Sequence, residues 1–390
     1  MAPIHFLRYD STYSSVNLLS NFKFLLSRPL TIFTFQVVQE SWDEQREFMT
    51  HARAALTSTA STLIQSLDTS YTALHRPPPT STSLLQQGFT LLQPNEWEQK
   101  RALGSQLTVQ FNATTSSLSY LHNSNTNRTW TSSFTHPMFR FMYRSHSYAE
   151  AVEYATIYKY SHGGKYPHRV ATGVPFPGMN NTVTIAKQWY PTISAMYVKE
   201  NRLVLETQVP TQPISMGYGA PQKVWLMYDT LDTHAEGRMM NVEVVWEGKS
   251  PTRLRESIWL EVRPDLSNVF TEEDDWKLWI DKIGEKVDAS DVVQQGGAAL
   301  HGMDPSGGVS LTSASSGAGL SIASLDCGLV APGSNTNIWN YTAYDDVPVQ
   351  PTDGFAFDLY SNLYAVNYPM WYPWKDGDDV SHFRFTVDEM

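Results

Sequence analysis

The sequence contains very little cysteine. Its single cysteine, Cys327, excludes an intramolecular disulfide and a metal site made of several cysteines. Because Cys327 lies between Leu325 and Leu329, we expect it to pack as a small buried residue.

Long apolar runs and basic stretches are also missing. No run approaches the roughly 20 apolar residues that a membrane-spanning helix needs. The apolar stretch at residues 22–38 is interrupted by Arg28 and Pro29, and no signal-peptide cleavage site follows it. The formal net charge is -11, and no Lys/Arg-rich stripe interrupts it. We therefore expect neither a membrane nor a nucleic acid as a partner.

Several motifs of catalysis are absent as well. There is no phosphate-binding GxxxxGK[ST], no GxGxxG between a strand and a helix, and no GxSxG serine elbow. His162 and His168 flank a glycine-rich segment, but no third ligand accompanies them. This pattern favours two exposed loop histidines over a metal site.

Aromatic residues and sequons are present in good number. Aromatics make up 13% of the chain, a proportion that favours β-structure and carbohydrate-facing surfaces. Glycosylation sequons begin at Asn112, Asn127, Asn180 and Asn340. They slightly favour a secreted or extracellular location, although no signal peptide is visible.

The predicted fold class is mainly β, an antiparallel β-sandwich preceded by a long amphipathic helix. We divide the chain into an irregular segment (1–36), a helical region (37–80), a β-sandwich domain (81–270) and C-terminal strands that complete the sandwich (271–390). The helix is predicted from a capping box at 41–44, from apolar residues three and four apart, and from the prolines at 77–79 that end it.

Alternating apolar residues and turn signals predict the strands. The stretch 271–283 fits either a short helix or a strand. The Gly/Ser-rich segment 296–321 is predicted as a loop around one short strand. The strands outside the C-terminal run are predicted at 107–111, 182–185, 203–209, 223–228, 242–246, 257–262 and 320–325.

The C-terminal run 354–387 is the clearest unit in the sequence. Residues 355–359 alternate as a half-buried strand, residues 360–374 form an aromatic loop broken by two prolines, and residues 383–385 alternate again. In the loop, aromatic faces suited to stacking on sugars occur with side-chain amides suited to sugar hydroxyls. An aromatic corner of the core remains the alternative.

Carboxylates that could serve a glycosidase cannot be paired from sequence, because their separation is set in space. Each candidate is more simply read as an acid that solvates the outside of a sheet. The candidates are Asp229, Glu243, Glu256, Glu261, Asp326 and Asp358.

Several segments together resemble glycoside hydrolase family 38-like proteins, which are related to α-mannosidases, and in particular relatives long described as a domain of unknown function. The stretch SNLYAVNYPMWY from Ser361 resembles a family signature, with departures at Ser361, Tyr364 and Val366. The other segments are SWDEQ from Ser41, WEGKSPTRLRESIWL from Trp246, Trp276–Val293 with His301, and Phe383–Phe385.

The resemblance implies an incomplete enzyme. In the full-length family an N-terminal (β/α) barrel carries the zinc ligands and the catalytic acids, and later β-domains support the sugar site. This chain resembles the helical and β portion only, so we expect no catalytic residue and no cofactor in it, with zinc belonging to the full-length family. An absent N-terminal barrel is then a candidate partner, and residues 1–36 would mark the seam of a truncated gene model.

The parent function would be hydrolysis of a glycoside, and this chain would at most contact carbohydrate. The predicted contact residues are Asn362, Asn367, Tyr368 and Trp371. One alternative is a stand-alone carbohydrate-binding or structural β-sandwich without enzymatic activity. A second is a glycosidase or lyase that uses carboxylates within the sandwich.

Overall fold

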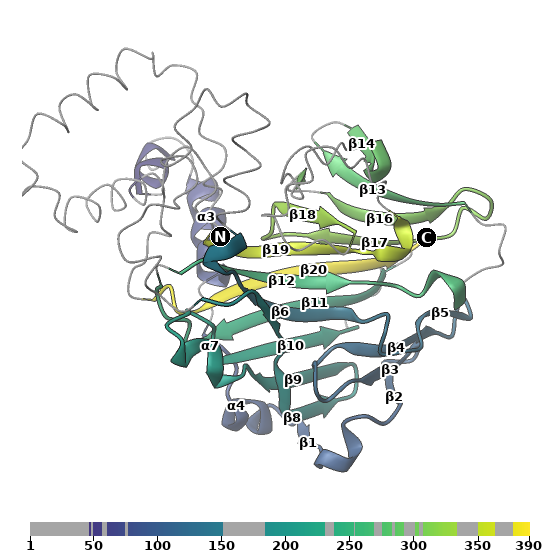
Figure 1. Ribbon diagram of the computed structural model, residues 1–390, viewed down its shortest axis with the longest axis horizontal. Helices are drawn as coiled ribbons and strands as arrows, with labels where there is room; N and C mark the ends of the chain where they lie inside the picture. The colour runs from purple at the N-terminus through teal and green to yellow at the C-terminus, as the bar shows by residue number, and fades with distance from the viewer. Residues whose placement is uncertain are drawn as a thin grey trace, which may run out of the picture. The chain divides into compact units, whose positions relative to one another are not determined.

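In the computed structural model, the chain forms two compact units. One unit contains the helical segments between residues 50 and 74, and the other contains the strands (Figure 1). The structure describes residues 47, 50–56, 61–74, 77–150, 184–230, 238–252, 254–268, 275–282, 285–291, 301–303, 307–333, 350–362 and 377–390.

The helical unit confirms the prediction of a helix ahead of the strands. Residues 50–56 are helical, and α3 (Ser61–Leu74) follows. Arg53 holds the two segments together, because it donates two hydrogen bonds of 2.7 Å to the carboxylate of Asp68. The helix α3 ends at Leu74, just before the prolines. The predicted capping box lies outside the described residues. No helix in the described part of the chain is long and apolar enough to cross a membrane.

The β unit consists of two antiparallel sheets. The first sheet runs, from edge to edge, β1 (Thr90–Leu91), β8 (Thr192–Lys199), β9 (Arg202–Gln208), β10 (Lys223–Asp229), β11 (Arg238–Glu247), β20 (Ser381–Glu389), β17 (Gly319–Ser324), β16 (Gly308–Ser313), β13 (Trp276–Lys282) and β14 (Glu285–Asp288). The second runs β15 (His301–Gly302), β18 (Leu329–Pro332), β19 (Phe355–Asn362), β12 (Glu256–Val262), β6 (Met138–Ser145), β4 (Leu118–Asn123), β3 (Leu107–Phe111) and β2 (Arg101–Leu103), with β5 (Arg128–Thr131) on β4 and β7 (Lys187–Trp189) on β6.

Short helical turns connect the strands. They are α4 (Ser81–Gln86), α7 (Thr211–Ser215), and the 3-10 turns η2 (Pro94–Glu96), η4 (Leu266–Asn268), η5 (Ala289–Asp291) and η6 (Pro351–Asp353).

Aromatic side chains join the two sheets across one core. The rings of Phe141 on β6 and Trp246 on β11 are 6.2 Å apart, and those of Phe357 on β19 and Phe385 on β20 are 5.0 Å apart. Offset or tilted ring pairs at these distances are favourable beyond the area that they bury. The mainly β, sandwich-like fold is therefore confirmed.

The apolar alternation located most strands correctly. In β3, burial alternates as the sequence predicts, with Leu107, Val109 and Phe111 inside. The strand β19 differs from the half-buried strand that was predicted, since Phe355–Tyr360 are all buried. The reason is a small apolar cluster on the outer face of the second sheet, made of Met142, Trp259, Ala331 and Ala356.

Three other predictions change. Residues 276–282 of the ambiguous stretch 271–283 form strand β13. The Gly/Ser-rich segment contains the hairpin β16–β17, in which small side chains such as Ser310 are buried. Thr184 and Ile185 precede β7 instead of forming a strand, and the Ile185 amide donates to the Tyr218 hydroxyl at 3.2 Å.

Candidate functional site

Three neighbouring strands of the second sheet end at one place. In the register, Glu256 at the start of β12 lies between Ser145 at the end of β6 and Asn362 at the end of β19. Because side chains alternate along a strand, Glu256 points into the core and Ser257 points to the outer face. Each face carries a polar network of its own.

The lysine network lies on the core side and consists of Tyr143, Gly219, Lys249 and Glu256. The Glu256 carboxylate accepts hydrogen bonds from the Tyr143 hydroxyl at 2.5 Å, from the Gly219 amide at 2.8 Å and from the Lys249 ammonium. Lys249 also donates to the Gly219 carbonyl at 2.8 Å, and its Nζ lies 4.3 Å from the centre of the Tyr360 ring. The side chains of Lys249 and Glu256 are 1% and 0% exposed, so this is a fully buried ion pair.

Burial and charge together set the ionisation of this network. Burial lowers the pKa of Lys249, while the neighbouring Glu256 carboxylate acts to raise it. Burial and the same carboxylate hold the pKa of Tyr143 well above its usual range, so its hydroxyl remains a donor. Nearly every polar atom of the lysine network has a hydrogen-bond partner. A buried ion pair satisfied in this way is typical of one that holds the surrounding chain in a single conformation.

Gly219 is required for the lysine network to close. A Cβ at this position would lie 2.2 Å from the Ser250 carbonyl oxygen and 2.9 Å from Lys249 Nζ. The network therefore ties the β9–β10 connection and the β11–β12 connection to the ends of β6 and β12.

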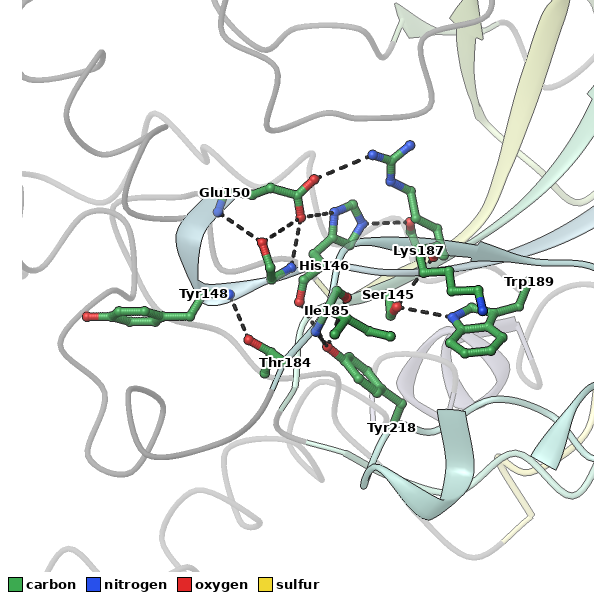
Figure 2. Close-up of polar contacts among 12 residues, drawn as sticks. Ser145, His146, Tyr148, Glu150, Thr184, Ile185, Lys187, Trp189 and Tyr218 are labelled. Carbon is green, nitrogen blue, oxygen red and sulfur yellow. Dashed lines mark hydrogen bonds and ion pairs between the residues drawn. The ribbon is translucent and has the colours of Figure 1, made fainter. Parts of the chain in front are cut away.

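The histidine network lies on the outer face and consists of Arg144, His146, Glu150, Ser257 and Trp259. His146 Nε2 is 3.0 Å from Ser257 Oγ, which also accepts a hydrogen bond of 2.8 Å from Trp259 Nε1. On the other side of the ring, His146 Nδ1 is 4.0 Å from Glu150 Oε2 (Figure 2). Arg144 lies 3.6 Å from the same carboxylate.

The order Ser–His–Glu is that of a hydrolase triad, but the setting is not. Ser257 is 0% exposed, so no substrate reaches its hydroxyl. Burial, together with the charges of Arg144 and Arg255, holds the pKa of His146 well below its ordinary value, whereas a general base works best near the operating pH. The histidine network is therefore a buried support for the end of β6.

Further hydrogen bonds fix the chain around β6 and β7. The Tyr218 hydroxyl donates to the His146 carbonyl at 3.0 Å, and Trp189 Nε1 donates to Ser145 Oγ at 3.1 Å. Lys187 lies over the Trp189 ring at 4.0 Å, and Figure 2 shows these groups gathered around the end of β6.

Asn362 is the one predicted contact residue among the described residues. Its amide nitrogen donates to the carbonyls of Thr252 at 2.9 Å and Leu254 at 3.3 Å, and its side chain is buried. Asn367, Tyr368 and Trp371 lie outside the described residues, as do His162 and His168.

The described residues on either side of the aromatic loop contact the same connection of the chain. Tyr360–Asn362, which were predicted as the first residues of the loop, belong to β19, and Asn362 binds the carbonyls of Thr252 and Leu254 in the β11–β12 connection. After the loop and before β20, the Asp379 carbonyl accepts a hydrogen bond of 3.2 Å from the amide of Lys249 in that connection. The β11–β12 connection, held by the lysine network, thus contacts the described chain before and after the loop.

Four of the six candidate carboxylates are bound to cationic or imidazole groups of neighbouring strands or connections. These pairs are Asp229 with Arg202 at 3.1 Å, Glu243 with His382 at 2.9 Å, Glu261 with Arg140 at 2.6 Å, and Asp326 with Arg384 at 2.9 Å. The fifth, Glu256, belongs to the lysine network.

Asp358 is the exception among the carboxylates. Burial raises its pKa to about 7, and Ser361 Oγ donates to its Oδ2 at 2.5 Å. Its Oδ1 is buried without a hydrogen-bond partner in the described part of the chain. Burying a carboxyl oxygen without a hydrogen-bond donor costs less free energy when the carboxyl is protonated and neutral. The missing partner of Oδ1 therefore agrees with the raised pKa of Asp358.

Sequence reasoning missed Lys249, Tyr143 and His146. Lys249 and Glu256 lie within one short segment, but their partner Tyr143 is distant in sequence, and only the pairing of β6 with β12 brings it near. No spacing in the sequence carries that signal. The described residues hold no group of three or more His, Cys, Asp or Glu suited to a metal.

Comparison with known proteins gives a family. No curated protein matches the chain. Among solved structures, a galactose mutarotase-like protein from Lactobacillus casei is 9% identical with a TM-score of 0.39, and the match covers 78% of this chain and 100% of that chain. A galactose mutarotase related enzyme from Lactobacillus acidophilus is 6% identical with a TM-score of 0.33, and the match covers 77% of this chain and 97% of that chain.

A family model matches residues 16–237, more than half of the 390 residues. The chain therefore belongs to the family described as a domain of unknown function, DUF5054.

Proposed function

We propose that this chain is the helical and β portion of a glycoside hydrolase family 38-like enzyme, and that its aromatic loop contacts carbohydrate. The resemblance of the segments from Ser41, Trp246 and Ser361 supports this proposal. Membership of a family described as a domain of unknown function agrees with it, since the resemblance is to relatives so described.

One observation carries the proposal at the level of the site. Asn362, at the end of β19 before the aromatic loop, and Asp379, between the loop and β20, both contact the β11–β12 connection. That segment is in turn fixed by a buried ion pair. A loop with a rigid base is a suitable carrier for binding residues, because less conformational freedom is lost when a ligand binds.

The residues of the loop would have distinct roles. Trp371 and Tyr368 would present aromatic faces to the C–H face of a sugar, and Asn367 would hydrogen-bond its hydroxyls. Asn362 would act as a support, because its amide is already engaged with the backbone.

The zinc of the full-length family is not assigned to this chain. The described residues offer no cluster of three ligands, so they do not fit that metal. Hydrolysis would therefore depend on groups outside these residues.

Sugar binding by the loop is tested by titrating neutral mono- and oligosaccharides into the protein and its Trp371→Ala variant. We expect weak binding that falls about two- to twelvefold in the variant, the equivalent of one stacking contact of roughly 0.5–1.5 kcal/mol. Phe134→Ala is the matched control, because Phe134 is 57% exposed and lies in the β5–β6 connection. Equal affinity in wild type and Trp371→Ala would remove the loop from the proposal.

A further inference from the structure

A polar hollow lies on the outer face of the first sheet, beside the end of β11. Its volume is about 540 Å³, within the range of roughly 300–1,000 Å³ that is typical of small-molecule sites. It is lined by Pro78, Ser194, Glu206, Gln208, Gln222, Lys223, Glu247, Gly248, Asp379 and Val380. The described residues of the histidine and lysine networks are not among these lining residues.

The floor of the hollow is fixed by a bridging lysine. Lys223 Nζ lies 2.8 Å from Glu206 Oε1 and 3.3 Å from Glu247 Oε1, so it joins β9 to the end of β11. The Trp225 ring centre lies 5.2 Å from the same nitrogen. Two ion pairs and one cation–π contact hold this donor in place.

Gly248 leaves room for the amide side chain of Gln222 in the lining of the hollow. Gly248 has a φ of +69°, and a Cβ there would lie 2.9 to 3.1 Å from three atoms of the Gln222 side chain. With glycine at this position, the Gln222 side chain has room beside the Gly248 backbone, and it lines the hollow together with Gln208. Two amides supply both donors and acceptors for a polyhydroxylated ligand.

The charge of the lining selects among such ligands. Three carboxylates stand against one ammonium, a formal net charge of -2. Glu206 and Glu247 are engaged with Lys223, whereas the Asp379 carboxylate has no hydrogen-bond or ion-pair partner among the described residues. A ligand that carries a positive charge would neutralise Asp379, and an anionic ligand would be repelled.

We propose that this hollow binds an amino sugar, a polyhydroxylated ring whose ammonium group pairs with Asp379 while its hydroxyls bond to Gln208 and Gln222. Pro78 and Val380 would cover the apolar C–H groups of the ring. This proposal is argued from residues other than those proposed to stack on sugar in the aromatic loop, and it does not depend on them.

The test compares three small sugars of matched ring size at pH 6: glucosamine, glucose and glucuronate. Dissociation constants are measured by ligand-observed NMR at low ionic strength. We expect glucosamine to bind about fivefold more tightly than glucose, the equivalent of one exposed ion pair of about 1 kcal/mol, and glucuronate to bind most weakly. The preference for glucosamine should disappear at about 1 M salt, where charges are screened within about 3 Å.

Variants assign the binding to the hollow. Asp379→Asn should remove the preference for glucosamine over glucose, and Gln222→Ala should weaken both sugars. Glu285→Gln is the matched control, since it removes one negative charge from β14, at the opposite edge of the first sheet, and should change nothing.

Three results would overturn the proposal: no binding of glucosamine, binding of glucuronate as tight as that of glucosamine, or a preference that survives in Asp379→Asn. Loss of binding in Trp371→Ala but not in Asp379→Asn would also overturn it and would place the sugar on the aromatic loop. Loss in Asp379→Asn with no effect of Trp371→Ala would support the hollow and contradict the function proposed for the loop.

Discussion

Replacing Lys249 with methionine should destabilise the β unit strongly. The change keeps an unbranched side chain of similar length but leaves the Glu256 carboxylate buried with no cation beside it. Removing one partner of a buried ion pair costs about 3–5 kcal/mol. A second argument gives a loss of stability of the same size, because a buried glutamate without a cation can lose its charge by taking up a proton when the chain folds. Protonating an ordinary glutamate at pH 7 costs about 3.7 kcal/mol, from a pKa near 4.3 and about 1.4 kcal/mol per pH unit.

The second argument also predicts the pH dependence of the loss. The destabilisation of Lys249→Met should shrink by about 1.4 kcal/mol for each unit by which the pH falls, to roughly 1 kcal/mol at pH 5. The double variant Lys249→Met/Glu256→Gln should recover most of the stability at pH 7, since no charge then remains buried.

The assay is urea unfolding followed by tryptophan fluorescence at pH 7 and at pH 5, for wild type and the single and double variants. The many buried tryptophans of the β unit, such as Trp246 and Trp259, report on its core. The reasoning is refuted by an unchanged free energy of unfolding at pH 7, by equal losses at both pH values, or by a double variant no more stable than the single one.

Three further predictions concern other residues of the β unit. Burial raises the pKa of Asp358 to about 7, so its carboxyl keeps a proton in the folded state that the unfolded chain releases near pH 4. The free energy of unfolding should therefore fall as the pH rises from about 4 to about 7, by at most about 4 kcal/mol. Asp358→Asn should flatten the stability–pH curve in that window and raise stability at pH 8, and an unchanged slope would be the contrary result. Gly219→Ala should cost about 3 kcal/mol by chemical denaturation, since its Cβ would meet the Ser250 carbonyl, whereas Gly328→Ala, with no atom within 4 Å of the added carbon, should be near neutral; similar losses in the two would contradict the packing argument. In a secretory host, a sugar added at exposed Asn127 should appear as a mass shift on gels that Asn127→Gln and glycosidase treatment both remove, and no shift would count against an extracellular location.

The strands were predictable where burial is one-sided. In β3, Leu107 and Val109 point inward and alternate with partly exposed residues, so the pattern in the sequence is the pattern of the fold. The same alternation located β19, but the prediction of one exposed face was wrong, because both faces of the strand are buried. Ala356 packs in the outer cluster, and Asp358 is buried beside it.

The sheet order could not be read from the sequence. The strand β20 at the end of the chain pairs with both β11 and β17, and these contacts depend on packing between distant segments. The same holds for the lysine network, in which Tyr143 meets Glu256 across two paired strands. Local periodicity indicates which residues form a strand, but not which strand lies beside it.

The aromatic loop was predicted as a feature of the sequence, and the structure adds what holds its ends. Asn362 was predicted as a carbohydrate-contacting residue, and its amide nitrogen donates to the carbonyls of Thr252 and Leu254. A side-chain amide can bond to a sugar hydroxyl or to a backbone carbonyl, and the backbone contact depends on the position of the β11–β12 connection, which the sequence does not show.

The relation to a glycoside hydrolase is tested most directly by mapping the transcript that encodes this chain. If the chain is the helical and β portion of a family 38-like enzyme, the reading frame upstream of Met1 should continue into a (β/α) barrel with histidine and aspartate ligands for zinc. A transcript that begins with this 390-residue frame, preceded by in-frame stop codons, would contradict the account.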